Sequence, residues 1–377
     1  MKKALIGGIA TATLATTASA GGIDRTPFTT SLLFEDGNRV EFSIGRVVPD
    51  VSGTQVEILG GALPGSVGAD SGDVANDYTT YALGFKTQVN DRVALAFIID
   101  QPIGASVAYN DPAYAYGGPV QSTADVDSTA ATALAQYQIT DAISVHGGVR
   151  ALQSKGSVAL FNGYAMDTSR ETDFGYLIGA AYEIPEYALR VALTYQSAIT
   201  HDFASTEFIP PSLGGPATLG GNFEVEVPQS VLLEAQSGVA PDTLVFGSVR
   251  WTDWTAFQIT PPNLGSTLVA YESDVWTFTA GVGRRFTDNW SGAVTASYEP
   301  STQEFTSNLG PTDGQTSLGV AATYEMDSGL EVTGAARYVW VGDADTSVPG
   351  TGGTGPALGE FRDNNAFGVG VRVAYSF

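Results

Sequence analysis

The chain has 377 residues and no cysteine, which excludes disulfide bridges and thiolate metal sites. Its formal net charge of −23 at pH 7 argues against nucleic acids and other polyanions as partners. Glycine is abundant, with 45 residues, and aromatic residues make up 10% of the chain, as curved strands with interfacial aromatics require. After the first twenty or so residues there is no run of about 18 apolar residues, so the composition favours an all-β protein without spanning helices.

The amino terminus predicts export. Met1, Lys2 and Lys3 form a short basic region, a small apolar stretch follows, and Ala18-Ser19-Ala20 offers a cleavage site before Gly21. We therefore expect a signal peptide at 1–20.

Turn chemistry then predicts the number of strands. Short turns recur roughly every 40 to 55 residues, about the span of two barrel strands and one long loop. Between them lie longer stretches rich in Gly, Pro and Asp, and together these connections separate about fourteen strands, an even number as single-chain bacterial barrels require. The six short turns are at Asn90-Asp91, Thr140-Asp141, Pro185-Glu186, Pro241-Asp242, Asp288-Asn289 and Asp327-Ser328-Gly329, and the seven longer stretches are at 49–76, 101–121, 161–171, 204–221, 259–268, 300–314 and 342–363.

The last strand, 365–377, has the clearest pattern. Its odd positions are apolar from Phe367 to Phe377, and its even positions are small or polar, including Arg372. Strict alternation with period two gives one apolar face and one small or polar face. The pattern predicts that one face of this strand contacts lipid. Elsewhere, in the region 222–237, Pro228 interrupts an otherwise regular strand.

Strand parity assigns most charges to the lumen, because a charge on the lipid face at mid-bilayer costs about 2–4 kcal/mol. The inward set predicted in this way comprises Lys86, Arg150, Arg190, Arg337, Arg372, Glu331, Glu41, Glu224 and Glu226.

Several segments, taken in order, resemble the outer-membrane long-chain fatty-acid transporter family. They are 46–53 (RVVPDVSG), 189–197 (LRVALTYQS), 251–257 (WTDWTAF), 285–290 (RFTDNW) and the terminal 373–377 (VAYSF). The resemblance implies a fourteen-stranded barrel in the bacterial outer membrane, plugged by an amino-terminal hatch. In this chain it implies a short plug segment at 21–38 and a β-barrel at 39–377. It further implies that hydrophobic substrates are captured in an outer groove and released by conformational change or through a wall opening. It also implies that the assembly machinery for barrels reads Tyr375 and Phe377.

The predicted loops favour an apolar ligand independently, because exposed apolar residues at this density indicate either a binding site or loops that pack on one another. Both interpretations remain open at this stage. The candidate groove residues are Ile103, Val107, Tyr109, Tyr114, Phe208, Ile209 and Leu213. An inward arginine, Arg190, Arg337 or Arg372, is expected to guide a fatty-acid carboxylate. Acidic loop residues are expected to form a solvated rim, with divalent cations that bridge lipopolysaccharide as the alternative.

No catalytic, metal or cofactor site is expected. Ser144 and His146 share a face, but two positions along one strand are about 7 Å apart, too far for a nucleophile and its base. His201 is predicted to face outward near a strand end. The leading hypothesis is passive, gated transport of long-chain fatty acids or similar molecules, and the alternatives are a water-filled porin and a structural or adhesion barrel.

We predict that Phe377→Asp leaves export intact but blocks insertion, because the terminal aromatic residue belongs to the signal that the assembly machinery would read. Fractionation of cells should then show the variant in the periplasm or degraded. Normal outer-membrane levels of the variant would refute this role of the terminal strand.

Overall fold

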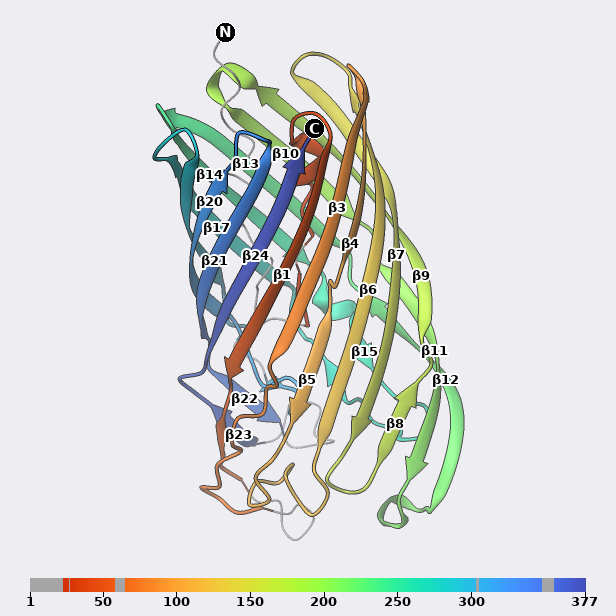
Figure 1. Ribbon diagram of the computed structural model, residues 1–377. Helices are drawn as coiled ribbons and strands as arrows, with labels where there is room; N and C mark the ends of the chain where they lie inside the picture. The colour runs from red at the N-terminus through yellow and green to blue at the C-terminus, as the bar shows by residue number, and fades with distance from the viewer. Residues whose placement is uncertain (1–22, 27, 58–64, 303–304, 348–355) are drawn as a thin grey trace.

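The computed structural model describes residues 23–377 except 27, 58–64, 303–304 and 348–355. The predicted signal peptide lies outside the described residues. Antiparallel strands form a closed barrel, and β1 pairs with β3 on one side and with the last strand, β24, on the other (Figure 1). No helix in the described part of the chain has the length and apolar character needed to cross a membrane.

The main sheet has 18 strand segments, and four pairs of segments run end to end, so the barrel has fourteen continuous barrel strands, as predicted. In chain order these are β1 (Arg39–Asp50), β3 (Tyr78–Asn90), β4 (Val93–Asp100) with β5 (Gly104–Ala108), β6 (Thr123–Gln138), β7 (Ile143–Ala159), β8 (Ala165–Thr168) with β9 (Glu171–Ile184), β10 (Leu189–Gln196) with β11 (Ile199–Ile209), β12 (Ala217–Val227) with β13 (Ser230–Ala240), β14 (Thr243–Thr252), β17 (Val275–Arg285), β18 (Trp290–Glu299), β20 (Gln315–Glu325), β21 (Leu330–Val341) and β24 (Asn365–Ser376).

Short segments outside the wall belong to the loops and the plug. They are β2 (Gly53–Gln55), β15 (Gln258–Ile259), β16 (Val269–Ala270), β19 (Phe305–Thr306), β22 (Ala344–Ser347), β23 (Ala357–Phe361) and the 3-10 turns η1 (Ser31–Phe34), η2 (Pro185–Tyr187), η3 (Pro211–Leu213) and η4 (Trp254–Ala256).

The six short turns join strands at one end of the barrel, where Arg39 at the start of β1 pairs with Ser376 at the end of β24 (Figure 1). The longer connections lie at the other end. Three of them are shorter than the composition suggested, because parts of 101–121, 161–171 and 204–221 are strands β5, β8, β11 and β12. Residues 204–209 alternate between exposed and buried side chains and pair in register with 217–222, Phe208 with Thr218, which leaves 210–216 as the connection.

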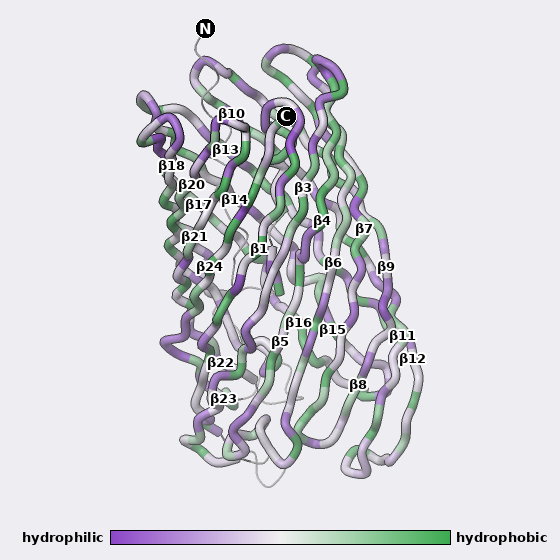
Figure 2. The backbone as a smooth tube through the Cα atoms, viewed as in Figure 1, coloured by the Kyte–Doolittle hydropathy of each residue, from purple (hydrophilic) through white to green (hydrophobic). Residues whose placement is uncertain are grey.

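Apolar residues alternate with small or polar residues along most of the wall, which Figure 2 traces along each strand. Phe42, Ile44, Leu83 and Phe85 are exposed on the outside, whereas Lys86 is buried on the inside of the same strand as Phe85. This is the arrangement of a wall that faces lipid outside and a polar lumen inside.

In four barrel strands, however, the side chains that face inward are even-numbered in one part of the strand and odd-numbered in the other. Ala192 and Thr194 of β10 are buried, but so are Ile199, His201 and Phe203 of β11. The change occurs at 197–198, directly beside the same change at 228–229 between β12 and β13, since Gln196 pairs with Ser230 and Ile199 with Val227. Similar changes separate β4 from β5 at 101–102 and β8 from β9 at 169–170.

These irregularities overturn three predictions from parity. His201 faces inward and is almost fully buried, whereas Glu224 and Glu226 pair with Asp202 and Thr200 on the outer face. The physical reason is local. Where the regular pairing of a strand is interrupted, the side chains that follow point to the opposite face of the sheet. Pro228 lies at such an interruption, where its backbone has no N–H to donate to the neighbouring strand.

We predict that the two ends of the barrel lie on opposite sides of the membrane, with 210–216 outside the cell. A cysteine at Ser212 should react with an impermeant thiol reagent on intact cells. A cysteine at Asp288, which is also exposed but lies in a short turn, should react only after lysis. The reverse labelling pattern would overturn the assigned orientation.

Candidate functional site: an apolar cavity above a plugged lumen

Beyond the four irregularities, large apolar side chains of these strands face inward and charged side chains face outward at several positions, the opposite of the lipid-facing part of the wall. Phe203 of β11 and Val225 of β12 are buried inside, while Asp202 and Glu224 of the same strands are exposed outside. Met166 of β8 is likewise buried, and its neighbour Asp167 is exposed. Charges on the outer face show that these strands project from the bilayer. Their inner faces therefore enclose an apolar space in the part of the barrel that is surrounded by water.

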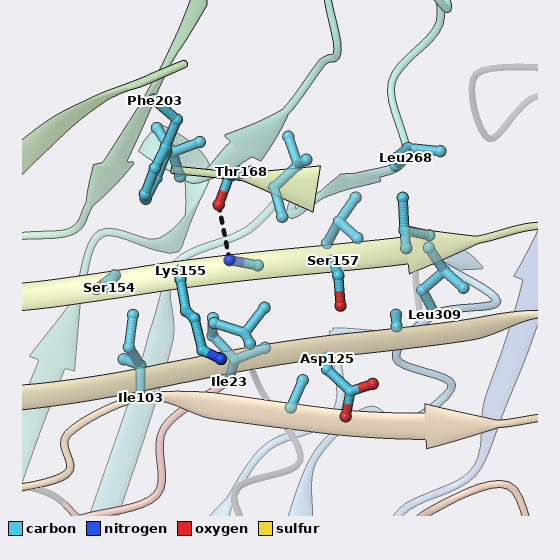
Figure 3. Close-up of a pocket in the computed structure, with 18 of the residues that line it drawn as sticks. Ile23, Ile103, Asp125, Ser154, Lys155, Ser157, Thr168, Phe203, Leu268 and Leu309 are labelled. Atoms are coloured by element: carbon cyan, nitrogen blue, oxygen red, sulfur yellow. Dashed lines mark hydrogen bonds between the residues drawn. The ribbon is translucent and has the colours of Figure 1, made fainter. Parts of the chain in front are cut away.

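This space is the outer cavity, which contains about 830 Å³ of empty volume, part of it open to solvent (Figure 3). Strands β5 to β8 form one side, β11 and β12 the opposite side, and residues of the connections around 257–271 and Leu309 the remainder. Ile23 from the amino-terminal segment also contributes. Most of the lining residues are apolar, with Ile103, Val158, Met166, Phe203, Phe223, Val225, Val227, Phe257, Ile259, Leu268 and Tyr271 among them. The polar members are Asp125, Ser154, Lys155, Ser157, Thr168 and His201.

The predicted groove residues are divided among four places. Ile103 lines the outer cavity, and Val107 lines a second cavity next to it. Tyr109, Tyr114 and Ile209 are buried in a cluster formed by the loops. The side chains of Phe208 and Leu213 are exposed and are absent from the linings of both cavities.

The loop cluster is built on stacked tyrosines. The rings of Tyr109 and Tyr114 stack with centroids 5.3 Å apart, and the ring of Phe361 packs edge-on against Tyr114. The Tyr109 hydroxyl donates to the Asn308 carbonyl at 2.6 Å. Burial raises the pKa of Tyr114 to about 12, so its phenol stays neutral. For these residues the second interpretation of the apolar loops, packing on one another, describes the structure.

A buried carboxylate fastens one loop to the cavity wall. Glu207 of β11 is inaccessible and accepts hydrogen bonds from the Tyr164 hydroxyl at 2.9 Å and the Asn263 side-chain amide at 2.9 Å. The backbone N–H of Leu264 donates to it at 3.1 Å. Bonds of this kind hold the 259–268 connection, which carries Ile259 and Leu268, over the outer cavity.

The amino-terminal segment, residues 23–38, lies inside the barrel and is called the plug segment here. Leu32 and Leu33 pack against Ala96, Leu134 and Leu177 of the inner wall. Polar anchors fix it at other points, since Thr29 and Thr30 donate to Glu234 at 2.7 and 2.9 Å, and Arg250 donates to Asp24 at 2.5 Å.

The lumen charges form paired networks below the outer cavity. Arg39 makes two bonds to Glu331, at 2.7 and 2.9 Å, and Arg150 makes two to Asp100, at 3.0 and 2.9 Å. The guanidinium of Arg190 stacks over Phe34 of the plug segment, 4.6 Å from the ring centre. Lys86 donates to the Glu35 carbonyl, Arg337 donates to Ser297, and Arg372 is buried. Arg190, Arg337 and Arg372, the expected head-group guides, do not belong to the lining of the outer cavity.

The plug segment also fills a break in the wall. Residues 78–82 of β3 and residues 101–105 are all described, and no ladder bonds join them. Backbone groups of 102–104 are bonded to the plug segment instead, through a bridge between Asp24 and Ile103. The N–H of Arg25 donates to the Pro102 carbonyl, and the N–H of Gly104 donates to the Ile23 carbonyl, both at 2.8 Å. The second cavity, with about 790 Å³ of empty volume, lies at this break and shares Ile23 and Tyr271 with the outer cavity.

The described residues contain no group of three or more His, Asp or Glu side chains suited to a metal ion. Ser144 and His146 are each engaged elsewhere, Ser144 with the Gln136 amide at 3.1 Å and His146 Nε2 with the Thr194 hydroxyl at 2.8 Å. Sequence reasoning missed Phe223 and Val225 as site residues, although Pro228 signalled the irregularity that turns them inward.

Taken together, a closed barrel, an occupied lumen and an apolar chamber at the end of the long loops define a plugged membrane β-barrel. Residues 33–377 match the family described as outer membrane protein transport protein (OMPP1/FadL/TodX), and the chain belongs to that family. It is therefore a transport protein of the bacterial outer membrane, in a family of transporters and not of enzymes.

Known relatives agree with this assignment. The chain is 25% identical over 317 residues to the long-chain fatty acid transport protein of Salmonella typhi, covering 72% of this chain and 70% of that protein. The fold is similar to a crystal structure of a Pseudomonas aeruginosa FadL homologue, with a TM-score of 0.77, 16% identity and 92% of each chain covered. It is also similar to the toluene transporter TodX of P. putida, with a TM-score of 0.63, 13% identity and 92% of each chain covered.

We predict that the wild-type protein conducts few ions in planar bilayers and that Glu234→Ala raises the frequency of conducting events. The substitution removes the acceptor of both Thr29 and Thr30, and each such charge-assisted bond is worth about 1.5–3 kcal/mol. Glu272→Ala, the same change on an exposed loop residue, should leave conductance unchanged. A large steady conductance of the wild-type protein would favour the porin hypothesis.

Proposed function

We propose that the protein transports long-chain fatty acids or similar hydrophobic molecules across the outer membrane by passive, gated diffusion. The single observation that carries this proposal is the outer cavity, an apolar chamber inside strands whose outer surface is polar. Binding in such a chamber stabilises an apolar solute by about 25 cal/mol for each Å² of its apolar surface that is removed from water. The names of the relatives, a long-chain fatty acid transport protein and a toluene transporter, support the same substrate class.

Packing of the plug segment distinguishes this function from that of a water-filled porin. Leu32 and Leu33 fill the lumen beside Ala96 and Leu134, and charged networks occupy the space around them. An apolar molecule that continued straight down this lumen would have to leave an apolar chamber for a polar one. Passage down the lumen is therefore the less favourable route for such a molecule.

We propose the wall break between β3 and β5 as the exit. The second cavity reaches it, and the outer residues beside it, Tyr81 and Leu83, are apolar and exposed as lipid-facing residues are. Backbone groups of 101–104 are already bonded to the plug segment instead of to β3, so a movement of residues 23–26 would open the break without separating paired wall strands. In this proposal the plug segment is the gate.

Replacing Phe203 by Ser tests the cavity. Phe203 is buried in the lining, and burying a Phe side chain against a ligand is worth about 1.5–3 kcal/mol, so affinity for a fatty acid should fall about tenfold or more. Uptake of radiolabelled oleate by cells that express the variant at normal surface levels is the measurement.

The same change at Phe208, five positions along the strand, distinguishes the cavity from a groove on the loops, because Phe208 points outward and is exposed. Loss of uptake with Phe203→Ser and not with Phe208→Ser supports the cavity. The opposite result would move the binding site to the outer groove expected from the sequence. Wild-type uptake by both variants would contradict transport through either site.

A further inference from the structure

Two polar atoms in the lining of the outer cavity have no hydrogen-bond partner. They are Oγ of Ser154 on β7 and Nε2 of His201 on β11, and both side chains are at least nine-tenths buried. Figure 3 labels Ser154 on β7, the strand that also carries Lys155 and Ser157. Buried polar side-chain atoms are normally bonded, so two unbonded atoms in one apolar cavity point to a ligand that supplies the partners.

The hydrogen-bonding role of His201 is fixed by its other nitrogen. Nδ1 lies 2.7 Å from Oδ2 of Asp173 on β9, and a carboxylate oxygen accepts, so Nδ1 carries the hydrogen. In the neutral ring Nε2 then holds a lone pair and can accept a hydrogen bond, and the residue belongs to the lining of the outer cavity.

The position of this imidazole is set by the strands around it. Backbone bonds join β9 and β10/β11 at Ser197–Tyr176 and again at Ser169–Ala204, and the described residues between these points form no ladder. The bond from His201 to Asp173 spans this interval. On the other side of the ring, Phe203 lies 5.2 Å away between ring centres. The side chain is therefore held at the edge of the cavity by a bond to one wall and a ring contact on its own strand.

We propose that the outer cavity selects hydrophobic molecules that carry a neutral hydroxyl group: an alcohol, a phenol or an undissociated carboxyl. Such a group donates its O–H to Nε2 of a neutral His201 or accepts from the Ser154 hydroxyl with its oxygen. A bare hydrocarbon leaves both atoms unbonded, and an ionised carboxylate has no hydrogen to give to Nε2. This inference rests on the proposed function and specifies the substrate class of the same site.

Binding of two matched probes tests the proposal. Para-heptylphenol and para-heptyltoluene differ only by a hydroxyl in place of a methyl group. Their dissociation constants are measured with the full-length mature protein in lipid nanodiscs and corrected for partition into protein-free nanodiscs. We expect the wild-type protein to prefer the phenol about tenfold, the effect of one or two net hydrogen bonds in a buried site.

Ser154→Ala and His201→Phe should each reduce this preference about three- to tenfold and leave affinity for para-heptyltoluene within about twofold. Ser154→Ala removes a hydroxyl that has no partner in the fold, so its stability should not fall even if His201→Phe, which leaves Asp173 unpaired, folds poorly. Ser144→Ala, the same change on the same strand but outside the cavity, should keep the wild-type preference.

Equal binding of both probes by the wild-type protein would overturn the inference while leaving the proposed function intact. Retention of the full preference in Ser154→Ala and in folded His201→Phe would also overturn it. Failure of both probes to bind, or affinities for both that are unchanged by Phe203→Ser, would contradict the proposed function as well.

Discussion

Backbone N–H and C=O groups in hydrocarbon must be bonded within the protein, and the rest of this structure depends on that constraint. It closes the barrel through the β1–β24 ladder, in which every position from Arg39 to Asp50 has a partner. It also explains why the break beside β3 is filled. The plug segment forms the hydrogen bonds to the Pro102 carbonyl and the Gly104 N–H that β3 does not form, so these two backbone groups have partners where the strands separate.

The four irregularities turn one wall into two environments. In the lipid-facing part the strands are apolar outside and polar inside. Beyond the steps at 197–198 and 228–229, the same strands place Phe203 and Val225 inside and Asp202 and Glu224 outside. A reversal of side-chain parity is therefore enough to convert a membrane wall into a water-exposed container for apolar molecules. The barrel does not need a separate domain for this purpose.

Loops and plug complete the container from its two ends. Glu207 fastens the connection that carries Leu268, the tyrosine cluster consolidates the other loops, and Ile23 contributes the plug's share of the lining. Ser154 and His201 are the polar residues of this lining that are almost fully buried, which gives them their importance. In an otherwise apolar site, one or two hydrogen-bonding groups decide which of several similarly sized molecules binds best.

The sequence by itself determined the fold class, the fourteen barrel strands and the positions of the short turns. These depend on local features: period-two alternation as in 365–377 and turn-forming pairs such as Asn90-Asp91. Only the tertiary structure decided the binding chamber. Whether an irregular step reverses the side-chain parity of a strand depends on how the neighbouring strand pairs with it. The adjacent steps at 197–198 and 228–229 turn His201 inward and Glu224 outward. Asp173, Asn263 and Thr29, which bond His201, Glu207 and Glu234, lie 28, 56 and 205 positions away from them in sequence, so no local pattern could have named these partners.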